Sequence, residues 1–460
     1  MKLKANKEHP NKRFWLLFSL LLATICVRYG LQIDIPRPVF LVLVAIIALQ
    51  AEQAEIIALC MGLIPLHEAL DFYYAIVICL VVYIIKYNRY IKFNFSMILV
   101  LVMLLWELLH CFTVSFSPVE LVTSFVPLIA LVIIMSSDIT DLDYAFIVRV
   151  LAISTAAICI TMFLQIIWLS DFNLGATLIN LRRLGALSET SKKALLISGA
   201  EVQTNSLGII CVIVISGLLQ LKFIGEKKRM DNFLIFTALM FGTLSASRTF
   251  LACLLLMLLL TMMGQRSGYR KLSFFAIMIL AGALFIAVFW KLFPNQLEYF
   301  ISRFFESDIT TGRDTLMVKY HKFIADNPDV LFFGIGLQDY GERLTNVYRV
   351  ARNVPHNSIQ EIVVAWGIPG MLMIILLIFI IIRISRKHKP HHRLMNYIPL
   401  IILLFKSMAG HLLTSGYTML ALSYAYLCLA QDFTRDSANN NKFIMHASAQ
   451  CPERRGGYVQ

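Results

Sequence analysis

Long apolar runs separated by short polar segments fill most of the chain. A helix needs about 20 apolar residues to cross a bilayer, and fewer where flanking side chains reach the interface. The pattern therefore predicts an all-α fold, a polytopic transmembrane helix bundle of about 12–14 spans over residues 14–431. The predicted spans lie near 14–28, 38–50, 55–66, 71–86, 95–115, 119–136, 144–169, 202–221, 232–246, 248–264, 272–293, 359–384, 397–412 and 417–431. The polar segment Gln50–Glu55 divides 38–66, so this region forms either two spans or one re-entrant pair.

One long polar interruption, 294–357, stands out from this pattern. We expect it to be a partly helical extracytoplasmic loop. Within it, Arg313–Asp326 has apolar residues at helical spacing, which predicts an amphipathic helix lying on the bundle; these residues are Leu316, Tyr320 and Phe323. The two glycines of Leu331–Gly336 predict a tight turn or a close backbone approach. A second short helix is predicted over 341–352, and the chain re-enters the membrane from Ser358.

Composition supports a membrane protein and argues against a soluble domain or a nucleic-acid-binding protein. The chain has 460 residues, of which 58% are hydrophobic and 15% charged, far less charge than a soluble domain carries. The net charge of +13 does not indicate nucleic-acid binding, because the basic residues cluster in short segments between apolar runs. That is the positive-inside pattern. It predicts a multi-pass protein of the cytoplasmic (inner) membrane, with a basic cytoplasmic N-terminus at 1–13, a disordered cytoplasmic tail at 432–460 and the long loop outside.

No cofactor or metal is expected. The nine cysteines lack CxxC spacing, and we interpret them as small apolar residues of helix packing. Walker A, HExxH and acidic metal motifs are not found. Any phosphate chemistry would therefore use arginines.

His356 is the first candidate for chemistry, because it lies just before the last long re-entry into the membrane. A histidine can act as a general base near neutral pH. The alternative is a solvated loop residue, with Asn357 or Ser358 serving as a helix cap.

Arg313 and Arg248 are the candidates for holding an anion. The arginine fork matches phosphate oxygens and keeps its charge, although Arg313 can also pair with Asp308 or Asp314. Arg248 lies in the short turn between two apolar spans. It is either held close to the bundle for function or extends to the interface as boundary arginines commonly do.

Further polar residues have two interpretations each. Arg183, with Arg182, lies in an outer loop against the positive-inside trend and so asks for a reason, whereas Glu201, Gln203 and Asn205 either bind sugar hydroxyls or satisfy one another and the helix end. Glu107 and Lys406 fall near the middle of predicted spans, where unpaired charges are costly, so we expect a mutual ion pair. Arg149 is expected to extend to the interface at a helix end.

Taken together, several motifs resemble the signature region of the O-antigen ligase and O-antigen polymerase superfamily. They are Thr311-Gly-Arg313, Asn327-Pro328, Gly334-Ile-Gly336, His356-Asn357 with Glu361, and Gly367-Ile-Pro-Gly370. The turn Ser245-Ala-Ser-Arg248 and the Arg183…Asn205 region are similar to that family more loosely. The resemblance covers roughly residues 180–385 by motif and the whole chain by topology.

This resemblance implies a glycosyltransferase that moves a glycan from undecaprenyl pyrophosphate to an acceptor hydroxyl, without metal or nucleotide. It implies that Arg248 and Arg313 hold the pyrophosphate and that His356 activates the acceptor, with inversion at the anomeric carbon. Arg183, Asn205, Asn357 and Glu361 are implied substrate-binding residues. The implied partners are the lipid-linked oligosaccharide, the lipid bilayer, and chain-length regulator and flippase proteins.

The motifs do not decide between a polymerase of O-antigen, capsule or exopolysaccharide repeats and a ligase that uses another acceptor; we favour the polymerase. The rival from another class is a flippase or transporter of lipid-linked oligosaccharide. Such folds often show paired halves with matching interrupted helices, and no internal repeat is evident here. A structural scaffold of a glycan-assembly complex is a third alternative.

Overall fold

The computed structural model describes most of the chain between Lys12 and Ala430. The described residues are 12–113, 118–138, 142–175, 177, 183–185, 194–197, 199–200, 202–265, 268–293, 295, 298–299, 301–302, 313–337, 356–387, 394–408, 410–411 and 415–430. The predicted tail 432–460, the predicted helix over 341–352 and most of the basic segment 1–13 lie outside them.

Apart from one isolated bridge between Ile91 and Ser137, the named elements of the described part are helices. This confirms the predicted all-α bundle. In chain order they are α1 Lys12–Ile25, η1 Cys26–Gly30, α2 Pro38–Gln50, α3 Gln53–Leu63, η2 Ile64–Leu66, α4 Phe72–Tyr87, η3 Asn88–Tyr90, α5 Phe95–Thr113, α6 Pro118–Ser136, α7 Tyr144–Leu169, α10 Thr204–Ile224, α11 Arg229–Leu244, α12 Arg248–Met263, α13 Gly268–Leu292, α15 Arg313–Asp326, α16 Pro328–Phe333, α18 Ser358–Lys387, α19 Leu394–Ser407 and α20 Gly416–Ala430.

Within the described residues, six helical segments are long and apolar enough to cross a bilayer. They are Lys12–Gly30, Phe72–Tyr90, Tyr144–Leu169, Thr204–Ile224, Lys271–Leu292 and Ser358–Arg386. Shorter apolar helices accompany them, such as Arg248–Met263 and Gly416–Ala430. The chain is therefore a multi-pass membrane protein.

The region 38–66 forms two separate helices. The backbone leaves helical geometry at Ala51 and Glu52, and α3 then begins with a capping box. In this box, the Glu52 backbone N–H donates to the Glu55 carboxylate at 2.9 Å, which satisfies a donor at the helix start. The polar segment 50–55 thus ends one helix and starts the next.

Successive helices connect at alternating ends of the bundle, which gives it two distinct ends. At what we call the basic end, the Lys86 Nζ donates to the Ala51 carbonyl at 2.5 Å, and the Lys92 backbone N–H donates to the Ser136 carbonyl at 2.8 Å. The opposite end, here called the loop end, carries the connection 64–71, the turn 245–247 and residues 410–411, together with the starts of α10, α15 and α18. Each candidate site residue lies at the loop end.

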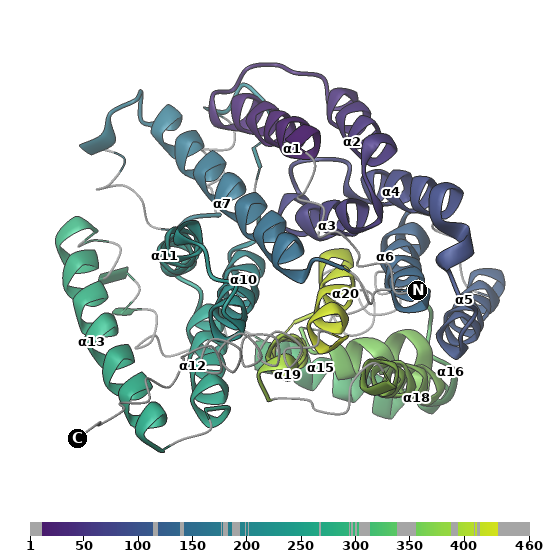
Figure 1. Ribbon diagram of the computed structural model, residues 1–460. Coiled ribbons are helices and arrows are strands. Elements are labelled where there is room, and N and C mark those ends of the chain that lie inside the picture. The colour runs from purple at the N-terminus through teal and green to yellow at the C-terminus, as the bar shows by residue number, and fades with distance from the viewer. Residues whose placement is uncertain are drawn as a thin grey trace, which may run out of the picture.

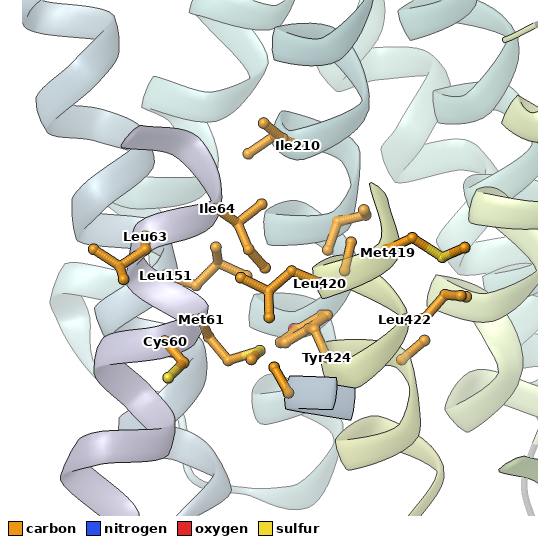
Figure 2. Close-up of a cluster of buried hydrophobic side chains, with 14 of the residues drawn as sticks. Cys60, Met61, Leu63, Ile64, Leu151, Ile210, Met419, Leu420, Leu422 and Tyr424 are labelled. Carbon is orange, nitrogen blue, oxygen red and sulfur yellow. The ribbon is translucent and has the colours of Figure 1, made fainter. Parts of the chain in front are cut away.

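The interior of the bundle is built on α3, α10 and α20 (Figure 1). Residues 55–63 of α3 are buried throughout, as are residues 418–430 of α20. Small residues in α20, such as Ala421 and Ser423, permit the close approach that membrane helices use in place of a hydrophobic driving force. Figure 2 shows side chains of α3, α7, α10 and α20 meeting in this core, with Leu420 and Tyr424 at its centre.

Helix α13 lies at the margin of the bundle (Figure 1). Its large apolar side chains are mostly exposed, for example Leu280 at 72% and Leu284 at 65%. In a bilayer, these positions face lipid.

Arg149 corrects one prediction from the sequence. Its side chain is buried and does not extend to the interface: its Nε lies 2.9 Å from the Asp231 Oδ1. Its Nη2 also donates to the Glu226 carbonyl at 2.6 Å. Acceptors in α11 and in the turn before it thus satisfy the guanidinium, and these hydrogen bonds offset the desolvation of the buried charge.

Candidate active site at the loop end

Helix α18 is broken inside the bundle, at Gly367. This residue has φ 65° and ψ −162°, which a helix cannot contain, and Pro369 follows it. Pro369 has no N–H to give to the carbonyl four residues earlier. The break therefore leaves the carbonyls of Val364 and Ala365 without their usual helical donors.

The Gly-Ile-Gly motif of the long loop supplies those donors. The Ile335 N–H donates to the Val364 carbonyl at 2.8 Å, and the Gly336 N–H donates to the Ala365 carbonyl at 2.8 Å. This confirms the close backbone approach predicted for residues 331–336. Because unpaired backbone groups are costly in a membrane, the loop and the broken helix stabilise each other.

Both glycines of the motif are required by this geometry. Gly334 and Gly336 have φ angles of 77° and 79°, in the region that glycine adopts without strain. A Cβ atom at 334 would lie 2.2 Å from the Ala365 carbonyl oxygen. At 336 it would lie 2.9 Å from the Cβ of His110.

Helix α5 fixes the other side of this junction. The Trp366 indole N–H donates to the Glu107 carboxylate at 2.7 Å, and the Leu337 N–H donates to it at 3.1 Å. The Nε2 of His110 lies 2.7 Å from the Phe333 carbonyl. The predicted ion pair between Glu107 and Lys406 is thus wrong for Glu107, because an indole and a backbone amide satisfy its carboxylate.

His356 and Asn357 lie immediately before the first turn of α18. The Asn357 Oδ1 accepts the Ile359 N–H at 2.9 Å, which is a helix cap. This side chain therefore has the capping role that the sequence offered as an alternative. His356 is partly buried, and its ring packs on that of His411, with centroids 4.7 Å apart and planes at 43°.

Lys406 lies beside this pair, with a side chain that is 6% exposed. Its Nζ donates to the His411 carbonyl and to the Thr418 hydroxyl, each at 2.9 Å. It also lies 5.1 Å from the centroid of the Tyr417 ring. These contacts replace the predicted ion pair for Lys406. We call His356, His411 and Lys406 the histidine cluster.

Helix α15 is attached to the same turn of α18. The Gln360 Nε2 donates to the Met317 carbonyl at 3.1 Å. Tyr320 is buried, and this burial, with the nearby Glu361 carboxylate adding to it, raises the pKa of the Tyr320 hydroxyl. Glu361 is itself fully buried. The predicted helix over Arg313–Asp326 is confirmed, and Arg313 is its first residue; the Arg313 side chain lies outside the described part.

A second group of polar residues surrounds the turn between α11 and α12. Ser247 caps α12, and its hydroxyl donates to the Asn205 Oδ1 at 2.8 Å. The Arg183 Nε donates to the Ser245 carbonyl at 3.0 Å, and the Leu184 N–H donates to the Leu244 carbonyl at 2.9 Å. Three elements distant in sequence thus meet in what we call the arginine cluster, which consists of Arg183, Asn205, Ser247 and Arg248.

Tyr417, near the start of α20, connects the two clusters. Its ring lies next to the Lys406 ammonium, and its hydroxyl interacts with the side chain of Ser206, the neighbour of Asn205. The His67 ring stacks on Tyr417 with centroids 4.6 Å apart. A continuous set of contacts therefore runs from His356 to the turn that holds Arg248.

Sequence reasoning missed His411, Tyr417 and His67. The signal that could have found two of them is the direction of the predicted spans, which assigns the loops 64–71 and 408–415 to the same end as 294–357. Had the polar residues of all loop-end connections been grouped, His411 and His67 would have been found. The contacts of His411 with His356 and of His67 with Tyr417 depend on which helices are adjacent. A single sequence does not show which helices are adjacent.

The chemistry available at this end combines arginine, imidazole and hydroxyl groups next to apolar helices. Comparison with protein-family models matches residues 232–375 to a family described as O-antigen ligase. The match spans α11 to the middle of α18, which includes Arg248, Arg313 and His356. A search of curated proteins finds no match to this chain.

Proposed function

Because this chain belongs, through residues 232–375, to the O-antigen ligase and polymerase superfamily, we propose that it polymerises lipid-linked oligosaccharide repeat units. In this proposal, the donor is an undecaprenyl-pyrophosphate-linked glycan and the product is an O-antigen, capsule or exopolysaccharide chain. The protein lies in the cytoplasmic membrane with both termini inside, and the loop end faces outward.

One observation carries this proposal: the contacts through Tyr417 that join His356 to the arginine cluster. An arginine presents two parallel donors to phosphate oxygens and stays charged, whereas an imidazole can accept a proton at neutral pH. Transfer from a lipid diphosphate needs both groups at one end of an apolar bundle. A transporter or a scaffold would not need an imidazole connected in this way to an anion site.

The proposed reaction is a single displacement. Arg248 and Arg313 hold the pyrophosphate, and His356 accepts the proton of the acceptor hydroxyl. The acceptor oxygen bonds to the anomeric carbon as the bond from that carbon to the pyrophosphate oxygen breaks. Undecaprenyl pyrophosphate leaves with the bonding electrons, and attack from the opposite side inverts the anomeric configuration.

The remaining candidates have supporting roles in this proposal. Arg183 and Asn205 hold the turn of Arg248 and offer further contacts to the glycan. Asn357 holds the first turn of α18, and Glu361 is fully buried near Tyr320 of α15. We therefore propose that Asn357 and Glu361 act on the substrate through the positions of His356 and Arg313.

The deciding experiment supplies purified protein with lipid-linked repeat units in detergent, without nucleotide. Longer glycans on lipid, with released undecaprenyl pyrophosphate, are the expected products of a polymerase. Transfer only to an added lipid acceptor would assign a ligase instead. No transfer in detergent, together with movement of the lipid-linked glycan across liposomes, would replace the proposal with the flippase. In cells, we expect a chain-length regulator and a flippase to act with the protein.

A further inference from the structure

The connection between α19 and α20 is held in place from two helices. The Ser358 hydroxyl of α18 donates to the Gly410 carbonyl at 2.9 Å. The Lys406 Nζ of α19 donates to the next carbonyl, that of His411, also at 2.9 Å. Two consecutive peptide groups are thus fixed by side chains from different elements. The backbone that carries the His411 ring is therefore held in place.

Lys406 is occupied within the protein and is not offered to a substrate. An ammonium has three donors; two go to the His411 carbonyl and the Thr418 hydroxyl, and the Tyr417 ring lies beside the group. The chain also passes closely over the lysine: a Cβ atom at Gly410 would lie 2.9 Å from the Lys406 Cε. Lys406 therefore acts as a fixed support for the 410–411 backbone.

Burying the charged side chain of a lysine within a membrane protein costs free energy. Charged side chains there are rare and usually functional, and a buried charge is seldom a better source of stability than a well-packed apolar residue. An apolar residue at 406 would pack α19 against α20 equally well. It would not donate to the His411 carbonyl, which is the property that distinguishes the lysine.

The ring of His411 rests on the ring of the proposed base, His356. We propose, on the basis of the proposed function, that His411 is a positioning residue for His356 and that Lys406 holds His411 in register. Both sides of the ring contact are then anchored: His356 precedes the capped start of α18, and His411 is fixed by its carbonyl. A base works only within hydrogen-bonding reach of the hydroxyl that it deprotonates, so packing that holds the ring preserves the rate of transfer.

The first test compares His411→Ala with His411→Phe in the transfer assay. The alanine variant is expected to lower kcat by about 10- to 100-fold, the scale of a misplaced catalytic group, and to leave KM within about twofold. The phenylalanine variant keeps an aromatic ring against His356 and is expected to retain most of kcat. Normal kcat in the alanine variant would overturn the proposal. Equal loss in both variants would also overturn it, because the imidazole itself would then be required.

The second test concerns the support. Lys406→Met keeps an unbranched chain but removes both donated hydrogen bonds, so kcat is expected to fall as in His411→Ala. Ser358→Ala removes the hydrogen bond to the Gly410 carbonyl, and this variant can be measured even if Lys406→Met does not fold. We expect Ser358→Ala to lower kcat less than Lys406→Met.

Lys86→Met is the matched control, since Lys86 also holds backbone carbonyls, those of Leu49 and Ala51, but at the basic end. Loss of transfer in Lys86→Met equal to that in Lys406→Met would overturn the proposal.

A third measurement does not depend on glycan transfer. Diethyl pyrocarbonate modifies accessible imidazoles, and peptide mass spectrometry reports the rate at His356 in protein without donor. We expect a faster rate at His356 in Lys406→Met than in wild type, with Lys86→Met unchanged. Equal rates in the three proteins would contradict the positioning role. If His356 is modified faster in Lys406→Met but the wild type transfers no glycan, the positioning role stands and only the proposed function is wrong.

Discussion

The indole N–H of Trp366 donates to the carboxylate of Glu107 at 2.7 Å, across 259 positions of sequence. Trp366 immediately precedes the break in α18, and Glu107 belongs to α5. The same carboxylate accepts the Leu337 N–H of the long loop. One acidic side chain thus joins three segments: a membrane helix, the loop and the broken helix.

Replacing Glu107 with alanine should therefore destabilise the protein. Hydrogen bonds to charged groups contribute about 1.5–3 kcal/mol each, and their buried donors would be left unsatisfied. We expect a loss of about 2–4 kcal/mol, seen as a lower unfolding temperature in detergent. Glu107→Gln keeps one acceptor and should lose less. An unchanged unfolding temperature for the alanine variant would show that water or another group satisfies Trp366 and Leu337.

The Gly-Ile-Gly motif should not tolerate side chains. In Gly334→Ala, the new methyl meets the Ala365 carbonyl oxygen at 2.2 Å, so residues 334–336 must move away from α18. We expect both unfolding temperature and transfer to fall. Gly282→Ala in α13 is the matched control, because no atom lies within 4 Å of a Cβ there. Alanine in a helix is favoured over glycine by about 1 kcal/mol, so Gly282→Ala should be neutral or slightly stabilising. Similar losses in both variants would contradict the docking of the loop on α18.

The proposed chemistry predicts distinct effects for the base and the arginines. His356→Ala should lower kcat by about 10²- to 10⁴-fold, the contribution of a general base, and Arg313→Ala should abolish chain growth. Arg248→Lys should also be impaired, because an ammonium lacks the fork geometry. Protein level and membrane insertion should stay normal in all three. Full-length polymer from His356→Ala and Arg313→Ala would exclude the proposed reaction, and full activity in Arg248→Lys would show that Arg248 has no phosphate to hold.

His67 should make the protein sensitive to acid. Burial lowers the pKa of His67 from 6.5 to about 4; the hydrogen bond to Ile64 opposes this shift, and the Lys406 charge adds to it. The Glu68 carboxylate, 3.6 Å away but half exposed, does not outweigh burial. Because the unfolded chain binds the proton more tightly, stability is fully present above about pH 6.5 and falls as pH drops toward 4.

The size of this effect follows from the shift in pKa, which corresponds to about 3 kcal/mol at 1.36 kcal/mol per unit. Unfolding temperatures measured between pH 7 and pH 4 should therefore fall in the wild type. His67→Phe keeps a ring against Tyr417 and should show a flatter profile over the same range. Equal slopes in the two proteins would mean that His67 is not the group responsible.

The order and bounds of the helices were predictable because apolar runs and short basic segments are local features of the sequence. Helices α2 and α7 have the predicted bounds, and α15 spans the predicted Arg313–Asp326. The cap at Asn357 was also visible as a local pattern. What could not be predicted is which helices lie side by side. Glu107 and Lys406 show this clearly: both were recognised as costly charges, but each is satisfied by one backbone group of a connecting segment and one neutral side chain of another helix.

The site was only half predictable for the same reason. Arg183, Asn205 and Arg248 were separate candidates that the turn at 245–247 brings together through Ser247 and the Ser245 carbonyl. His411 drew no notice, because its importance arises from the contact with His356. The roles of these residues in catalysis remain predictions that the variants above address.

The break in α18 has a consequence for biosynthesis. The amides of Ile335 and Gly336 leave the ribosome before the carbonyls of Val364 and Ala365 that they serve. Until residues 335–336 have folded back onto α18, these two carbonyls lack their protein donors. Docking of the loop on α18 is therefore a late step in folding, because it needs both segments to have been synthesised.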